Sequence, residues 1–231
     1  AGADVFAGSR QFPESGVQVE YLRCQSCGYM FTPHFDGWTD GDFREQVYNA
    51  GYLKADPPFT EERPGRLAGY LAEVLGERLS RVSLVDFGSG TGRMVELLRS
   101  AGLGRGVAYD RYHGDGRLPS ERFDIVTAFE VVEHVVDQQA LFQELCSLVA
   151  EEGVLVLSTL LQPADIGTLG ASWWYACPRN GHLGFHTAQT LEGVLRAHGF
   201  KLWSLSPEVH VAARGAGDLA VRFIESGEPS Q

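Results

Sequence analysis

The sequence predicts an α/β fold in which a doubly wound, mostly parallel sheet follows a small, irregular N-terminal segment. One observation is an apolar strand at 82–85 that runs into three alternate glycines and then into helical spacing at 94–98, the form of a βα unit. The other is the apolar runs at 123–129 and 154–159, continuous enough to be buried on both sheet faces. We expect an N-terminal unit at 1–58 and the sheet domain at 59–231.

The composition is that of one globular domain with a small appendage, since 44% of the 231 residues are hydrophobic. A net charge of −11 disfavours nucleic acid as a partner, because like charges repel. No apolar run is long enough to span a bilayer, and neither a signal peptide nor a disulfide framework is recognisable. We therefore expect a cytoplasmic protein.

The N-terminal unit contains Cys24 and Cys27, a C-x-x-C pair followed by Gly28 and flanked by two short expected strands. Two thiolates at this spacing can bind one zinc ion, but a structural zinc site needs four ligands. His34 could add only one ligand, and a second cysteine pair would have to lie upstream of Ala1. The alternative is two reduced cysteines in a turn.

The next stretch, 36–58, is aromatic and rich in turns, and includes Trp38 and Tyr52. We expect it to cover the mouth of a site, although core packing is the more ordinary role for any single ring. A helix is expected from Arg63, with Pro64 in its first turn.

The glycine turn reads Asp86-Phe87-Gly88-Ser89-Gly90-Thr91-Gly92. Glycines let a ligand approach the backbone closely, and the following helix offers unpaired N–H groups. Arg93 stands where a dinucleotide-binding fingerprint requires its third glycine, and no phosphate-binding P-loop is present. These exclusions leave a nucleotide-like ligand of another kind, or a structural glycine turn that binds no ligand.

The pattern hydrophobic-Asp-x-Gly-x-Gly-x-Gly resembles motif I of the class I S-adenosylmethionine-dependent methyltransferases. The resemblance implies a seven-stranded, Rossmann-like methyltransferase sheet in which Asp86 faces the ammonium group of the cofactor. It also implies that Gly88, Ser89, Gly90 and Gly92 admit the cofactor. In related enzymes a tyrosine of the covering segment reaches the cofactor carboxylate, which is the role expected of Tyr52. The cysteine pair in turn resembles half of the zinc ribbon that precedes some sugar methyltransferases.

A second strand, 106–110, ends in Asp110 about 20 residues after the glycines, where such folds place the carboxylate that accepts the ribose hydroxyls. We expect Asp110 to take that role, with Arg111 beside it. The segment between Asp110 and the strand at 123 is shorter than usual. This shortening leaves Asp115 as the candidate for the adenine amino group.

The strand 123–129 is followed by Glu130-Val131-Val132-Glu133-His134-Val135, which resembles the fourth motif of ubiquinone-biosynthesis and small-RNA 2′-O-methyltransferases. We expect Phe129 and Glu130 to contact the cofactor. Glu130, Glu133 and His134 would lie on one helical turn, and the resemblance implies that they could bind a magnesium-like ion together with His182. Alternatively, His134 or His182 is a general base with an ordinary pKa near 6.5. We favour the histidine mechanism.

A long connection at 172–186 is expected on the same edge of the sheet, where ligands bind in open α/β folds. Aromatic faces and polar donors suit a sugar or another polyhydroxylated substrate, although the two tryptophans could also cover the core. The candidate substrate residues are Trp173, Trp174, Tyr175, Arg179, Asn180 and His186.

Towards the C-terminus, helical spacing at 141–148 and a helix capped by Thr187 and ended by Gly199 complete the expected helices. Residues 200–205 and 219–224 are expected to form the final antiparallel strand pair. The sequence therefore predicts a methyltransferase of EC class 2.1.1 that uses S-adenosylmethionine to O-methylate a small molecule or a carbohydrate-like substrate. C- or N-methylation, or a non-catalytic cofactor-binding partner module, are the alternatives.

Overall fold

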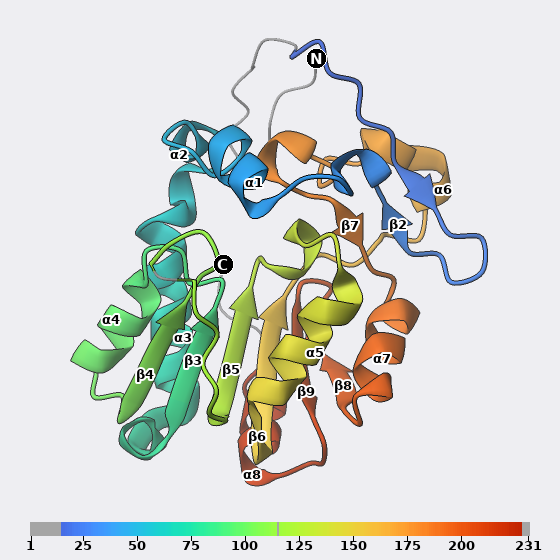
Figure 1. Cartoon of the computed structure of the whole chain (residues 1–231). Coiled ribbons are helices and arrows are strands. Elements are labelled where there is room, and N and C mark those ends of the chain that lie inside the picture. The colour runs from blue at the N-terminus through green and yellow to red at the C-terminus, as the bar shows by residue number, and fades with distance from the viewer. Residues whose placement is uncertain (1–14, 115, 228–231) are drawn as a thin grey trace.

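The main sheet of the described chain has six strands in the order β4-β3-β5-β6-β9-β8 (Figure 1). The structure is a computed structural model that describes residues 15–114 and 116–227. The first four strands pair in parallel, and β9 runs antiparallel to both β6 and β8. In sheet order the strands are β4 (Arg105–Tyr109), β3 (Ser83–Phe87), β5 (Phe123–Phe129), β6 (Val149–Ser158), β9 (Val209–Ala213) and β8 (Lys201–Ser204).

Helices cover both faces of this sheet, so the doubly wound α/β architecture is confirmed (Figure 1). One face packs against α3 (Glu62–Leu75), α4 (Arg93–Ser100) and α8 (Asp218–Ser226), and the other against α5 (Gln138–Leu148) and α7 (Ala188–Ala197). Neighbouring residues of one strand serve opposite faces, because strand side chains alternate: Leu84 joins the first core and Val85 the second. Both side chains are fully buried, as the apolar run predicts.

Two expectations about the sheet need correction. The main sheet has six strands rather than the predicted seven, since the described residues of 111–122 form no strand. These residues already form the connection from β4 to the parallel strand β5. One such crossover takes about a dozen residues or more, so no length is left for an additional strand.

The final antiparallel pair is formed by β8 and β9 rather than by 200–205 with 219–224. Residues 219–224 lie in α8, where Ala220 and Phe223 share the buried face at helical spacing. The strand missed by the sequence, β9, reads Val-His-Val-Ala-Ala and is buried throughout. Alanine and histidine are weak strand signals, and pairing on both sides is what makes this segment a strand.

A second, three-stranded sheet joins the N-terminal segment to the long connection after β6. It consists of β1 (Leu22–Arg23), β2 (Met30–Phe31) and β7 (Gly184–Phe185), paired antiparallel. Helices α1 (Asp40–Gln46), α2 (Tyr52–Ala55) and α6 (Ile166–Leu169) lie at the same end of the molecule (Figure 1). The N-terminal segment and the connection thus meet over the carboxyl ends of the parallel strands.

Candidate active site

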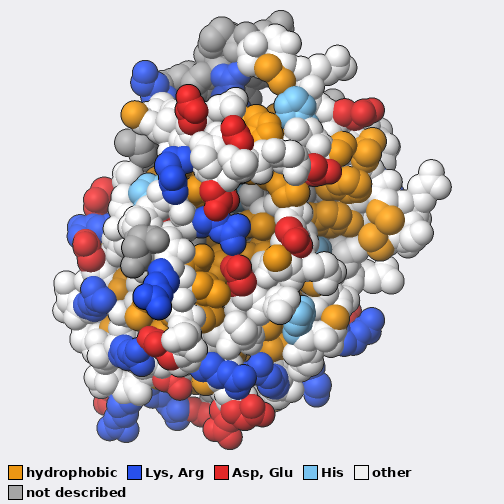
Figure 2. Space-filling model, viewed as in Figure 1, with side chains coloured by type: hydrophobic (Ala, Val, Ile, Leu, Met, Phe, Trp, Pro, Cys, Tyr) orange, Lys and Arg blue, Asp and Glu red, His pale blue; other side chains and the backbone are white. Residues whose placement is uncertain are grey.

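A cavity of about 280 Å³ lies at the carboxyl ends of β3, β4 and β5, beneath the N-terminal segment. Figure 2 shows a depression near the middle of the molecular surface in view, where hydrophobic side chains are bordered by acidic and basic ones. The predicted residues that line the cavity are Asp86, Gly88, Ser89, Asp110, Arg111, Phe129, Glu130, Tyr52, His134 and His182.

The glycine turn after β3 depends on backbone conformations that only glycine adopts without strain. Gly88, Gly90 and Gly92 have φ values of +76°, +55° and +80°. A Cβ at Gly88 would lie 2.5 Å from a methyl of Val131, and one at Gly90 would lie 2.6 Å from the Phe59 ring. Gly90 and Gly92 do not line the cavity themselves; they allow the turn that brings Ser89 to its edge.

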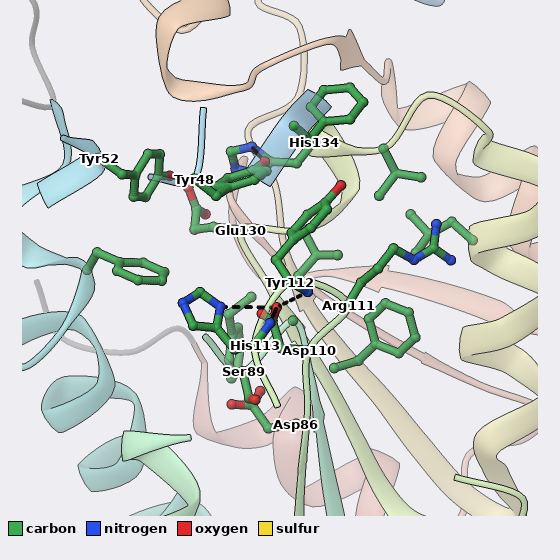
Figure 3. Close-up of a pocket in the computed structure, with 18 of the residues that line it drawn as sticks. Tyr48, Tyr52, Asp86, Ser89, Asp110, Arg111, Tyr112, His113, Glu130 and His134 are labelled. Atoms are coloured by element: carbon green, nitrogen blue, oxygen red, sulfur yellow. Dashed lines mark hydrogen bonds and ion pairs between the residues drawn. The ribbon is translucent and has the colours of Figure 1, made fainter. Parts of the chain in front are cut away.

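Asp110, at the end of β4, has a carboxylate oriented by the backbone around it (Figure 3). Oδ2 accepts a hydrogen bond from the Gly90 N–H at 2.8 Å, and Oδ1 accepts from the N–H groups of Tyr112 and His113 at 2.7 and 2.9 Å. The His113 ring lies 3.2 Å from Oδ1. The neighbouring Asp115, the candidate for the adenine amino group, lies outside the described residues.

Asp86 is a buried acid at the wall of the cavity, where it accepts a hydrogen bond from Thr127 Oγ1 at 2.8 Å. Burial, with a smaller contribution from the nearby Asp110, raises the pKa of Asp86 to about 7. No lysine or arginine of the described chain forms an ion pair with it at salt-bridge distance. A buried carboxylate of this kind suits a cationic group on a ligand.

The cavity has an aromatic wall from the segment 36–58, as the sequence predicts, and a basic group, Arg63, that the sequence did not indicate. The Arg63 guanidinium forms two hydrogen bonds with the buried Asp56 carboxylate, at 2.9 and 3.0 Å, and lines the cavity. Tyr48, on the segment between α1 and α2, stacks on Tyr112 at a centroid distance of 4.7 Å. An arginine followed by proline at a helix start is an ordinary pattern, so only the acidic residue seven positions earlier could have suggested the pair.

Glu130, directly after β5, has φ of +53° and is the sole described non-glycine residue with positive φ. The expectation that Glu130, Glu133 and His134 share one α-helical turn is therefore wrong. The chain turns sharply at Glu130, and a 3₁₀ helix follows at Val132–His134. Ser158 Oγ donates to Glu130 Oε1 at 2.8 Å. Burial, followed by the nearby Glu133, raises the Glu130 pKa to about 7.

Glu133, His134 and His182 form a compact group, with one ligand atom from each lying within 4.8 Å of the others. Glu130 is not part of this group. His134 Nδ1 lies 3.1 Å from the Gly181 carbonyl oxygen, and His182 Nδ1 lies 2.7 Å from that of Tyr175. Because a carbonyl can only accept, these contacts place a hydrogen on each Nδ1 and a lone pair on each Nε2. The Tyr48 hydroxyl, also 3.1 Å from His134 Nδ1, then accepts from the same hydrogen.

Burial keeps both imidazoles neutral. It lowers the pKa of His134 to about 4 and that of His182 well below its usual range. The ordinary value near 6.5 expected from the sequence is thus wrong for both. Glu133 is fully buried, accepts a hydrogen bond from the Tyr175 hydroxyl, and makes no hydrogen bond through Oε2 with any described residue.

Two neutral imidazoles and one carboxylate are a fitting donor set for a divalent ion. The same combination is used in catalytic zinc sites. The Gly181 and Tyr175 carbonyl oxygens, which accept from the two Nδ1 atoms, hold the imidazole rings in orientation, as is usual for histidine ligands. Magnesium prefers oxygen ligands, so the group fits zinc or manganese better than magnesium. The same lone pair on His134 Nε2 could instead accept a proton from a substrate.

The predicted substrate residues are dispersed, and none of the six lines the main cavity. Trp173 is buried against Phe185, and His186 is buried between Gln138 and Thr190 at 3.0 and 3.1 Å. Asn180 is buried, with its side-chain oxygen accepting from Cys177 Sγ at 3.3 Å, whereas Arg179 is exposed. The remaining two, Trp174 and Tyr175, line a second, smaller hollow.

Cys24 and Cys27 lie in the turn between β1 and β2, as expected, and Gly28 has φ of +81°. Backbone N–H groups, that of Cys27 first, lower the pKa of the Cys24 thiol. No third histidine, cysteine or acid within the described ranges completes a metal-binding group with the pair. The His34 ring packs against Phe35 instead, at a centroid distance of 4.8 Å.

A Rossmann-like sheet with a glycine turn after its first parallel strand and an acid after the next is the arrangement expected of a class I S-adenosylmethionine-dependent methyltransferase domain. Comparison with known families agrees: residues 59–205, more than half of the chain, match a family described as a methyltransferase domain, and the chain belongs to that family.

Relatives among characterised proteins are distant. The ubiquinone biosynthesis O-methyltransferase of Azorhizobium caulinodans is 33% identical over 122 residues, which are 48% of this chain and 47% of that protein. The protein of the same name from Bradyrhizobium diazoefficiens is 50% identical over 42 residues, 18% of this chain and 17% of its own. The chain thus spans about half the length of the Azorhizobium relative.

Solved structures share the fold. Human N-acetylserotonin methyltransferase in complex with S-adenosylmethionine has a TM-score of 0.54 at 14% identity, covering 78% of this chain and 60% of that one. A Burkholderia thailandensis 1,6-didemethyltoxoflavin-N1-methyltransferase has a TM-score of 0.53 at 14% identity, covering 85% of this chain and 97% of that one. Within residues 15–114 and 116–227, no helix has both the length and the apolar character needed to cross a membrane.

Proposed function

We propose that this chain O-methylates a hydroxyl group of a small molecule, with S-adenosylmethionine as the methyl donor. Family membership supports the donor, and the distant O-methyltransferase relatives favour oxygen as the acceptor. The observation that carries the proposal is the unprotonated Nε2 of His134, a residue that lines the main cavity.

In this proposal the cofactor lies across the ends of β3 and β4. Asp86 faces its ammonium group, and Asp110 accepts the ribose hydroxyls through lone pairs that the turn leaves available. Arg63 and Tyr52, which also line the cavity, face its carboxylate. The methionine end then points toward Glu130 and His134, since these residues line the same cavity beside Arg63.

Methyl transfer is an in-line displacement in which the acceptor oxygen replaces the sulfur on the methyl carbon. The acceptor hydroxyl gives its proton to His134 Nε2, and its oxygen forms a bond to the methyl carbon. The bond between that carbon and sulfur breaks, its electron pair stays on sulfur, and S-adenosylhomocysteine leaves. Because burial lowers its pKa to about 4, His134 is neutral at physiological pH and can accept the proton, but it is a weak base. The charge that it gains is stabilised by the nearby Glu130 carboxylate.

A divalent ion held by Glu133, His134 and His182 is the second candidate, favoured by the convergence of their ligand atoms. Such an ion would lower the pKa of a bound hydroxyl. The three side chains would then hold the acceptor in place, and another group would take the proton. A structural zinc at Cys24 and Cys27 is a separate proposal, supported only by the C-x-x-C turn.

The test is transfer of labelled methyl groups from S-adenosylmethionine to an extract of small molecules, followed by mass spectrometry of the labelled products. An O-methyl ether as the product supports the proposal. Labelled N-methyl or C-methyl products would replace it with the corresponding alternative. Tight binding of S-adenosylhomocysteine without any transfer would favour a non-catalytic partner module.

A further inference from the structure

A second hollow adjoins the main cavity, and part of its lining is exposed at the molecular surface. Four residues line both spaces, namely Arg63, Leu67, Phe129 and Glu130. The two hollows therefore adjoin at these four side chains. The second hollow is completed by Arg66, Ser158, Leu160, Trp174, Tyr175, Glu208 and Val209.

The main cavity leaves little space for an acceptor. Its volume of about 280 Å³ lies at the lower end of the range of ligand pockets, about 300–1,000 Å³, so a cofactor bound there occupies most of the space. The second hollow has a further 190 Å³. A cavity of about 150 Å³ holds one benzene ring, so the second hollow accommodates a single six-membered ring with substituents.

Glu130 lies where the two spaces meet, and its backbone is in the left-handed region. Such strain in a non-glycine residue is found preferentially at functional sites. Its carboxylate accepts from Ser158, another lining residue of the second hollow. An acceptor atom that enters from the second hollow would thus meet Glu130 before it meets the cofactor.

The lining combines one large aromatic surface with groups of both hydrogen-bonding types. Trp174 is 46% exposed, whereas the adjacent Trp173 and Tyr175 are 5% and 2% exposed. Arg66 and Glu208 are exposed at the rim, and Glu130 with Ser158 is deeper. A guanidinium only donates and a carboxylate only accepts, so the hollow matches a ring that offers both acceptors and donors.

We propose that the second hollow binds the methyl acceptor and that this acceptor presents a single sugar ring. The electron-rich face of Trp174 packs against the C–H face of the ring, which carries partial positive charge. Arg66, Glu208 and Glu130 bind hydroxyl groups around its edge. The rest of a larger acceptor would extend into solvent. This inference rests on the proposed O-methyltransferase function.

The experiment is saturation-transfer difference NMR on the whole chain with S-adenosylhomocysteine present and methyl α-D-glucopyranoside or methyl α-L-rhamnopyranoside as the probe. We expect saturation of the ring protons in the original chain and a decrease of about fivefold in Trp174→Ala, with most of the signal kept in Trp174→Phe. Arg66→Ala should reduce the signal, whereas Arg81→Ala, at an exposed arginine before β3, should leave it unchanged.

Calorimetry with S-adenosylhomocysteine distinguishes a failure of this inference from a failure of the proposed O-methyltransferase function. If the cofactor product fails to bind, the proposed function falls. If it binds normally and neither sugar is saturated, the sugar acceptor alone is overturned. Saturation of 4-hydroxybenzoate instead, lost in Trp174→Ala, would replace the sugar with an aromatic acceptor. A loss of S-adenosylhomocysteine affinity in Trp174→Ala would assign the hollow to the cofactor and overturn the proposal.

Discussion

The backbone N–H of Gly90 donates a hydrogen bond to Asp110 Oδ2 at 2.8 Å. This bond joins the glycine turn after β3 to the end of β4, so the two predicted cofactor motifs form one unit before any ligand binds. The carboxylate orientation is therefore set in advance, which reduces the entropy lost on binding.

Asp110→Ala is expected to weaken S-adenosylhomocysteine binding by at least about tenfold, because a hydrogen bond to a charged group contributes about 1.5–3 kcal/mol. Isothermal titration calorimetry measures this change. Asp110→Asn, which keeps an oxygen for Gly90, is the control for the turn and should lose less affinity. Unchanged affinity in Asp110→Ala, or tight binding of NADH, would contradict the assignment.

The affinity for S-adenosylhomocysteine should increase with pH up to about 7. Burial raises the pKa of Asp86 to about 7, so in the free protein the group is protonated below that pH. The ligand ammonium needs the ionised form, and binding then releases one proton, giving up to about a tenfold gain per pH unit. Asp86→Asn should bind weakly and without this slope. A steep slope that persists in Asp86→Asn would show that another group titrates.

The raised pKa of Asp86 also makes the stability of the ligand-free protein depend on pH. The folded chain holds a proton on Asp86 that the unfolded chain releases near pH 4, so this group lowers the stability of the ligand-free protein as pH rises from about 4 to about 7. Thermal unfolding of Asp86→Asn should show a smaller decrease across this interval than the original chain does.

The catalytic group can be resolved by chelation and substitution together. With His134 as base, EDTA should leave turnover unchanged and His134→Ala should reduce the rate by about 10²–10⁴-fold. Because burial lowers the His134 pKa to about 4, the rate should show no histidine inflection between pH 6 and 8. Loss of turnover in EDTA that zinc or manganese restores, with equal damage from Glu133→Ala and His182→Ala, would establish the ion instead.

Glu130→Gly should increase the free energy of unfolding by about 1 kcal/mol, because glycine adopts the left-handed backbone at this position without strain. It should at the same time reduce methyl transfer, since the carboxylate between the two hollows is removed. Urea denaturation and the labelled-methyl assay give the two values. Any decrease in the free energy of unfolding would contradict the prediction, and Ser158→Ala, which removes the partner of the same hydrogen bond, measures the cost of losing that bond alone.

The purified chain should retain less than one equivalent of zinc after dialysis, because Cys24 and Cys27 supply two of the four ligands of a closed site. Elemental analysis measures the content, and Cys24→Ser/Cys27→Ser is the matched control. A full equivalent that disappears in this double variant would mean that further ligands complete the site.

The sequence by itself determined the parts of this protein that depend on neighbouring residues. Apolar runs marked β5 and the core of β6, and the acid-glycine pattern marked the turn between β3 and α4. Thr187 marked the start of α7, where its hydroxyl accepts from the Thr190 N–H at 3.1 Å. Such signals act within one strand or one turn, so they can be read without knowing the rest of the chain.

Only the tertiary structure decided which distant residues meet. The pairing of β9 between β6 and β8, the Arg63–Asp56 contact at the cavity and the sharp turn at Glu130 all arise from packing between segments. The same holds for the loop 173–182, in which Trp173 is buried, Trp174 is exposed and His182 lies beside His134. Sequence spacing could nominate these side chains, but burial and carbonyl partners, which come from elsewhere in the chain, determine where each one points and which protons it carries.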